Sequence, residues 1–180
     1  MERAKERLTL VVPVTVVLIF LLLYLCFRNG TEALMLMGAL PFAAVGGVWL
    51  LYAMSFQMSV AVAAGFILLL GLAAEFAVVM LMYIKGAVEQ KRPATRRELE
   101  QAVIEGAVLR VRPKAMTALT VVLGLMPLLL AGGPGSEAMQ RIAAPMIGGM
   151  ITAPLVSLLL LPVLYWLWQR RRYPETGATE

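Results

Sequence analysis

The chain has 180 residues, of which 61% are hydrophobic, and its mean hydropathy is +0.82. A soluble domain is roughly half apolar, so this composition indicates an integral membrane protein without a soluble domain of its own. Histidine and aspartate are both absent, which removes the usual catalytic bases and makes an intramembrane enzyme the least favoured class. The formal net charge of +5 does not indicate nucleic acid as a partner, because the basic residues cluster between apolar segments.

Five apolar stretches are long enough to cross the ~30 Å hydrocarbon core of a bilayer. In chain order they cover about residues 10–27, 33–54, 58–84, 115–131 and 142–168. The first follows three basic residues, as in a signal peptide, but no small-residue cleavage site follows it. Interior prolines and glycines are tolerated where neighbouring helices pack closely. The sequence therefore predicts an all-α, five-helix transmembrane bundle, with residues 1–180 as a single transmembrane region.

The connection over residues 85–114 is the only long one, and it holds eight basic residues. Within it, Leu99, Ala102, Val103 and Ala107 recur at helical spacing. We expect an amphipathic cytoplasmic helix at the membrane surface here. A solvated basic loop is the alternative.

Positive charge is divided unequally between the two sides of the predicted bundle. Twelve basic residues fall on one side, from Arg28, the 85–114 connection and residues 170–172, and four fall on the other. The positive-inside rule then places the C-terminus in the cytoplasm and the N-terminus outside. A basic N-terminus is hard to translocate unless earlier spans have carried it across. The sequence therefore reads as the C-terminal part of a longer chain.

Two charged residues are candidates for proton handling. Glu75 is a buried charge within the third stretch, where an ionised carboxylate costs at least ~2–3 kcal/mol. Lys114 lies at the start of the fourth stretch, directly before residue 115. Glu75 lies nine residues before Ile84, or roughly 13 Å along a helix. The two side chains therefore meet only if the fourth helix begins before Lys114 or the third is broken. The alternatives are a helix–helix hydrogen bond for Glu75 and an interfacial anchor for Lys114.

Methionine is the third signal, because thioether sulfur is a soft ligand that prefers Cu(I). Twelve methionines are present, and packing of irregular gaps is the default explanation for most of them. Met139 differs because it lies in residues 132–141, which we expect to form a loop at the outer membrane edge. Met139 is therefore the candidate metal ligand. The single cysteine, Cys26, excludes a disulfide framework.

Four stretches resemble the resistance-nodulation-division (RND) efflux pumps, and within them the copper/silver heavy-metal subgroup. They read LPFAAVGG over residues 40–47, GLAAEFAVVMLM over 71–82, GAVLRVRPKAMT over 106–117 and GSEAM over 135–139. The last continues into a similar run that ends at Pro154. The resemblance extends to about Gln169 and implies the last five transmembrane helices of such a pump, the eighth to the twelfth.

The resemblance implies roles for particular positions. Glu75, Lys114 and Thr117 fall on the proton relay of the copper/silver pumps, whose relay aspartate lies on a helix that this chain does not contain. Met139 falls on a methionine that passes Cu(I) or Ag(I) towards the periplasm. Divalent-metal relatives differ at the Glu75 and Met139 motifs, and drug pumps have a lysine in the corresponding helix. Monovalent ions are therefore favoured.

The implied function is that of a secondary transporter and not an enzyme: a proton-driven Cu(I)/Ag(I) efflux pump of the Gram-negative inner membrane, with the metal as cargo and no cofactor. The implied partners are membrane lipid, the N-terminal remainder of the pump, further copies in a homotrimer, a periplasmic adaptor and an outer-membrane channel. Two alternatives stay open, a non-transporting subunit or remnant of a split gene and an RND pump for organic compounds. Residues 1–180 alone are expected not to complete a transport cycle.

Overall fold

The computed structural model describes residues 2–133 and 135–173, with side chains from residue 13 onward. Its elements are α1 (Glu2–Phe27), α2 (Gly30–Ala53), α3 (Val60–Lys91), α4 (Arg96–Val108), α5 (Val111–Leu130), α6 (Ser136–Gln169) and a short 3₁₀ turn, η1 (Arg170–Arg172). No strand occurs in the described ranges. The predicted all-α class is therefore confirmed.

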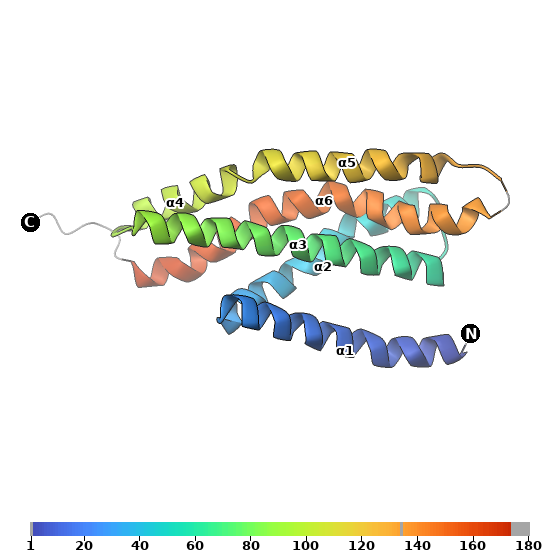
Figure 1. Ribbon diagram of the computed structural model, residues 1–180, viewed down its shortest axis with the longest axis horizontal. Coiled ribbons are helices and arrows are strands. Elements are labelled where there is room, and N and C mark those ends of the chain that lie inside the picture. Colours follow the sequence, from blue (N-terminus) through green and yellow to red (C-terminus); the bar gives the residue numbers. More distant parts are fainter. Residues whose placement is uncertain (1, 134, 174–180) are drawn as a thin grey trace, which may run out of the picture.

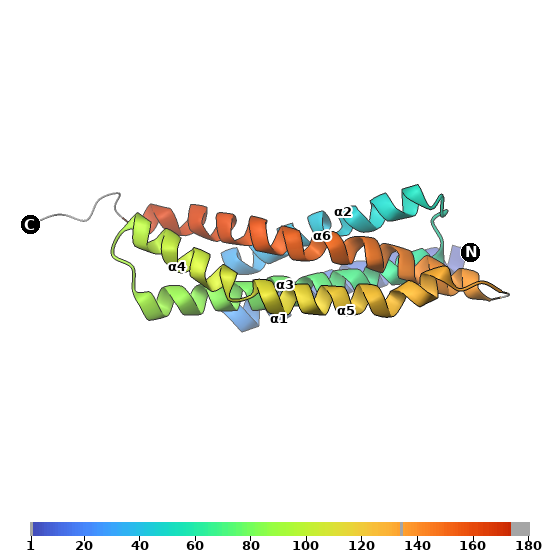
Figure 2. The same cartoon turned by 90° about the horizontal axis from the view of Figure 1, so that it is seen from above.

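Helix α6 is the centre of the bundle and packs against α2, α3 and α5. Helix α2 crosses the long axis obliquely, whereas α3, α5 and α6 follow it (Figure 1; Figure 2). Helix α1 lies to one side and packs mainly against α2 (Figure 1). Successive long helices alternate in direction, so the start of α1 and the end of α6 lie at opposite ends of the molecule (Figure 1).

Four helical stretches of the described chain are long and apolar enough to cross a membrane. They are Gly30–Ala53, Val60–Lys91, Arg96–Leu130 and Ser136–Arg172. The described apolar part of α1 is Pro13–Phe27. The predicted first span, 10–27, includes three residues whose side chains lie outside the described part of the chain. Helices α4 and α5 follow each other with only two residues between them, which makes them almost one continuous rod.

Glycines and a threonine bring the backbones of α2 and α6 together. A Cβ on Gly148 would lie 2.8 Å from the Leu50 Cβ and 2.9 Å from the Gly46 carbonyl carbon. The Thr152 hydroxyl donates to the Ala43 carbonyl at 2.7 Å and accepts from the Gly46 N–H at 3.2 Å. In lipid, helices associate through close packing and such interhelical hydrogen bonds. This crossing therefore fixes α2 on the central helix.

Helix α4 is the predicted amphipathic helix. It begins with a reciprocal cap, in which Thr95 accepts from the Glu98 N–H at 3.3 Å and the Glu98 carboxylate accepts from the Ala94 N–H at 2.8 Å. Its apolar face, including Leu99 and Val103, is buried. This apolar face packs on α3 and α6. In this structure the apolar face of α4 is therefore covered by protein and, contrary to the expectation, does not lie on lipid.

Candidate functional site: a buried lysine between three helices

Lys114 is the one buried residue of α5, and only 1% of it is exposed. Helix α5 begins at Val111, before this lysine, because Pro113 lies in the first turn, where its missing N–H removes no helical bond. The Lys114 N–H already bonds to the Arg110 carbonyl at 3.1 Å. The first of the two conditions for contact between Lys114 and Glu75, a helix that begins before Lys114, is thus met. Lys114 is not an interfacial anchor here.

Three helices surround the ammonium group of Lys114. Its Nζ donates to the Oγ of Ser157 on α6 at 2.6 Å. The Ser157 hydroxyl donates in turn to the Pro154 carbonyl at 2.9 Å. The ring of Phe76 on α3 lies 5.8 Å from Nζ, within the range of a cation–π contact. A formally charged group is therefore held in an apolar bundle by a hydroxyl and an aromatic ring, both of them neutral.

Glu75 does not pair with Lys114 in this structure. Neither of the ion pairs Lys85–Glu32 and Lys91–Glu105 includes Glu75. Glu75 is exposed, whereas its neighbour Phe76 belongs to the buried face of α3. Adjacent helical residues point about 100° apart. The expectation that Glu75 is buried is therefore wrong, although Phe76 shows that Lys114 reaches the same level of α3.

The other two predicted site residues are also exposed. The Thr117 hydroxyl bonds at 3.0 Å to the carbonyl four residues earlier in its own helix, as helical threonines commonly do. Met139 is 54% exposed and lies in the first turn of α6, which begins at Ser136. The prediction of a loop at Met139 is therefore wrong. Gly135, with φ of 91°, turns the chain into the helix, and Glu137 suits its positive N-terminal end.

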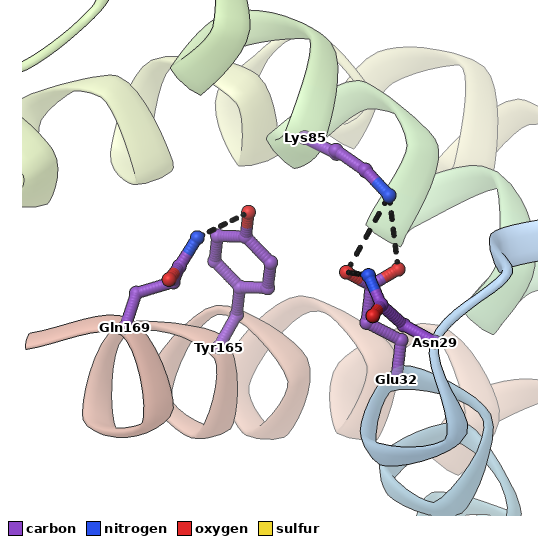
Figure 3. A network of polar contacts seen from close by, with 5 residues as sticks. All are labelled: Asn29, Glu32, Lys85, Tyr165 and Gln169. Carbon is purple, nitrogen blue, oxygen red and sulfur yellow. Dashed lines mark hydrogen bonds and ion pairs between the residues drawn. The ribbon is translucent and has the colours of Figure 1, made fainter. Parts of the chain in front are cut away.

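A second buried charge was not predicted. Glu32, in the first turn of α2, is 2% exposed. Its carboxylate pairs with Lys85 of α3 at 3.2 Å and accepts from the Asn29 amide at 3.1 Å (Figure 3). Tyr165 and Gln169 of α6 line the same cavity, of about 580 Å³ (Figure 3).

The sequence carries a weak signal for this acidic residue. The predicted second span starts at residue 33 and therefore leaves Glu32 out. Asn29 is the N-cap of α2. An acid just after such a cap favours a helix N-terminus. That preference was the available signal for Glu32, but it does not identify the partner on α3.

We expect the two halves of the Glu32–Lys85 pair to differ in their effect on stability. Lys85→Met leaves an unpaired carboxylate that is 2% exposed and should cost about 3–5 kcal/mol of unfolding free energy. Glu32→Gln should cost about 1 kcal/mol, because Lys85 is 30% exposed and reaches water. The measurement is unfolding of the detergent-solubilised chain by a denaturing detergent.

The pair Lys91–Glu105 provides the matched control. Its side chains are 40% and 59% exposed, so Lys91→Met should cost less than about 1 kcal/mol. Equal losses for Lys85→Met and Glu32→Gln would contradict the view that the buried carboxylate sets the cost.

Known proteins match this chain along most of its length. The model of the AcrB/AcrD/AcrF family matches residues 1–169. SilA of Salmonella typhimurium is 56% identical over 178 aligned positions. The cation efflux system protein CusA of Escherichia coli (strain K12) is 54% identical over 180. Each alignment covers 95% of this chain and 17% of the relative. The chain therefore spans about a sixth of the length of these relatives.

Solved structures agree with the sequence comparison. A crystal structure of a heavy metal efflux pump matches with a TM-score of 0.80 and 36% identity. The match covers 92% of this chain and 16% of the pump. The RND resemblance predicted from the motifs is thus confirmed. The chain belongs to the AcrB/AcrD/AcrF family, with the heavy-metal efflux pumps among its relatives.

Proposed function

We propose that the chain is the C-terminal membrane part of a proton-driven Cu(I)/Ag(I) efflux pump in the Gram-negative inner membrane. The observation that carries the proposal is that the one buried residue of an apolar helix, α5, is a lysine. Ionisable groups inside membranes are costly and mark ion and proton pathways. The cargo follows from the copper/silver resemblance at Glu75 and Met139, and identities of 56% and 54% to SilA and CusA support it.

The proton relay in this proposal consists of Glu75, Lys114 and Thr117 together with a carboxylate from the rest of the pump. The hydrogen-bond and ring contacts of Lys114 are both to neutral groups, Ser157 and Phe76, so a carboxylate that approaches the ammonium gains a charge-assisted hydrogen bond. Protonation of that carboxylate removes the attraction. Alternation between the two arrangements would shift α5 against α6, and that movement would drive the metal-binding parts of the pump.

Topology and partners complete the proposal. The N-terminus lies in the periplasm and the C-terminus in the cytoplasm, an arrangement supported by the opposite positions of the first and last helix ends (Figure 1). The segment works within a homotrimeric pump that engages a periplasmic adaptor and an outer-membrane channel. Residues 1–180 expressed alone should confer no metal tolerance.

The test is a chimera in which residues 1–180 replace the matching segment of Escherichia coli CusA. In a strain without its own exporter, the chimera should restore growth on copper and silver. A chimera that inserts stably but leaves the strain metal-sensitive would contradict the proposal. Tolerance to organic compounds without tolerance to metals would favour the organic-compound alternative.

Met139→Ile in the chimera should lower tolerance to copper and silver, because a thioether ligand is replaced by a side chain of similar size that binds no metal. The matched control is Met58→Ile. Met58 is 79% exposed and belongs to the connection between α2 and α3. That connection lies at the end of the bundle where α6 begins (Figure 1). Growth on graded metal concentrations measures both variants. Equal tolerance in the two would remove Met139 from the metal path.

A further inference from the structure

We propose that Ser157 is a positioning residue for Lys114, because its hydroxyl holds the ammonium group on the α6 side of the site until a carboxylate competes for it. The hydrogen bond between the two side chains stands on the geometry alone. Its part in transport rests on the proposed function.

The direction of the hydrogen bonds follows from the donors present. A lysine ammonium has three donors and no acceptor, so the 2.6 Å contact with Ser157 has Lys114 as its donor. The one hydroxyl proton of Ser157 is directed to the Pro154 carbonyl at 2.9 Å. The lone pairs of Oγ are therefore turned towards Lys114. Ser157 is 3% exposed, so water does not compete for this acceptor.

The neutrality of Ser157 is what makes the contact reversible. A carboxylate on α6 would keep the ammonium in a permanent ion pair, whereas a hydroxyl is a weaker acceptor that a carboxylate displaces. Residues 142–169 of α6 contain no acidic or basic side chain. The charged groups that come closest to Lys114 along the neighbouring segments are Arg110, the N-cap residue of α5, and Glu75, which directly precedes Phe76 on α3.

A purely structural role for Ser157 predicts different behaviour. A helical serine that only bonds back to a carbonyl of its own helix stabilises or bends α6 without any influence on Lys114. A measurement on the Lys114 side chain itself therefore distinguishes the two roles of Ser157.

Lysine resonances can be assigned in this chain because it has four lysines: Lys5, Lys85, Lys91 and Lys114. The experiment records the ¹⁵Nζ resonances of the lysine-labelled 180-residue chain in lipid nanodiscs. Loss of one signal in Lys114→Arg assigns Lys114. We expect Ser157→Ala to shift the Lys114 resonance and leave the other three in place, and Ser157→Thr, which keeps the hydroxyl, to restore it.

Ser136→Ala is the matched control, since it removes a hydroxyl from the same helix, where it bonds to the Gly133 carbonyl at 2.7 Å. It should leave the Lys114 resonance unchanged. An unshifted Lys114 resonance in a Ser157→Ala chain that retains its helical circular dichroism overturns the proposal.

Transport in the CusA chimera tests the second half of the inference. Ser157→Ala should lower the rate of proton-coupled metal export about ten-fold, the effect of one charge-assisted hydrogen bond, and Ser157→Thr should recover most of it. Wild-type export by Ser157→Ala, despite a shifted Lys114 resonance, overturns the positioning role. If the unmutated chimera exports no metal, the proposed function fails, and the resonance test still decides whether Ser157 holds Lys114.

Discussion

Lys114→Met is expected to abolish metal export and, at the same time, to stabilise the chain. Lys114 is 1% exposed, and its ammonium has no carboxylate partner among the described residues. The interactions of a buried charge often do not offset the cost of removing it from water. Replacing such a charge with an apolar side chain of similar volume is then stabilising, by about 1–4 kcal/mol. The Ser157 hydroxyl keeps its bond to the Pro154 carbonyl, so the substitution leaves no buried donor unsatisfied. A residue kept at a cost to stability is expected to serve function.

Two measurements are needed for this variant. Detergent unfolding of the 180-residue chain gives the stability, and growth of the chimera on copper and silver gives the activity. Lys91→Met, which removes an exposed lysine from the pair with Glu105, should leave export unchanged and stability within about 1 kcal/mol. A Lys114→Met chain that is both less stable and inactive would indicate that the lysine is a structural residue.

Gly148→Ala should disrupt the crossing of α2 and α6 and lower the unfolding free energy by about 3 kcal/mol or more. The added Cβ would lie 2.8 Å from the Leu50 Cβ and would also clash with the backbone of Gly46. Backbone atoms of a helix cannot rotate away as a flexible side chain does. The helices would therefore have to separate, at the expense of the Thr152 hydrogen bonds to α2.

The matched control for the crossing is Gly124→Ala on α5. A Cβ at Gly124 meets nothing within 4 Å, and alanine is favoured over glycine in a helix by roughly 0.5–1 kcal/mol. Gly124→Ala should therefore leave the chain equally or slightly more stable. Similar unfolding midpoints for the two alanine variants would contradict the close approach of α2 and α6 at Gly148.

The sequence predicted the helical architecture because hydrophobic length and turn residues are local signals. The apolar residues of the amphipathic helix, among them Leu99 and Val103, were identified correctly from their spacing and are buried. The predicted fourth stretch starts at residue 115, whereas α5 begins at Val111 and holds Pro113 in its first turn, a position to which proline is well suited.

The faces of the membrane helices could not be predicted in the same way. Helix α3 is apolar around most of its circumference, so periodicity does not distinguish the side that meets α6 from the side that is exposed. The burial of Glu75 was expected from its depth within the third stretch, whereas Glu75 is exposed and its neighbour Phe76 is the residue that contacts Lys114. Likewise, Ser157 and the Glu32–Lys85 pair depend on contacts between distant parts of the chain.

The measurement that tests the central claim most directly is silver-dependent proton movement in proteoliposomes that carry the CusA chimera. With a pH-sensitive dye inside the vesicles, Ag(I) should elicit proton flux opposite to the metal, and Lys114→Met should remove both fluxes. Silver transport that continues in Lys114→Met, or that proceeds without any proton movement, would contradict the assignment of Lys114 as the charge that couples protons to export.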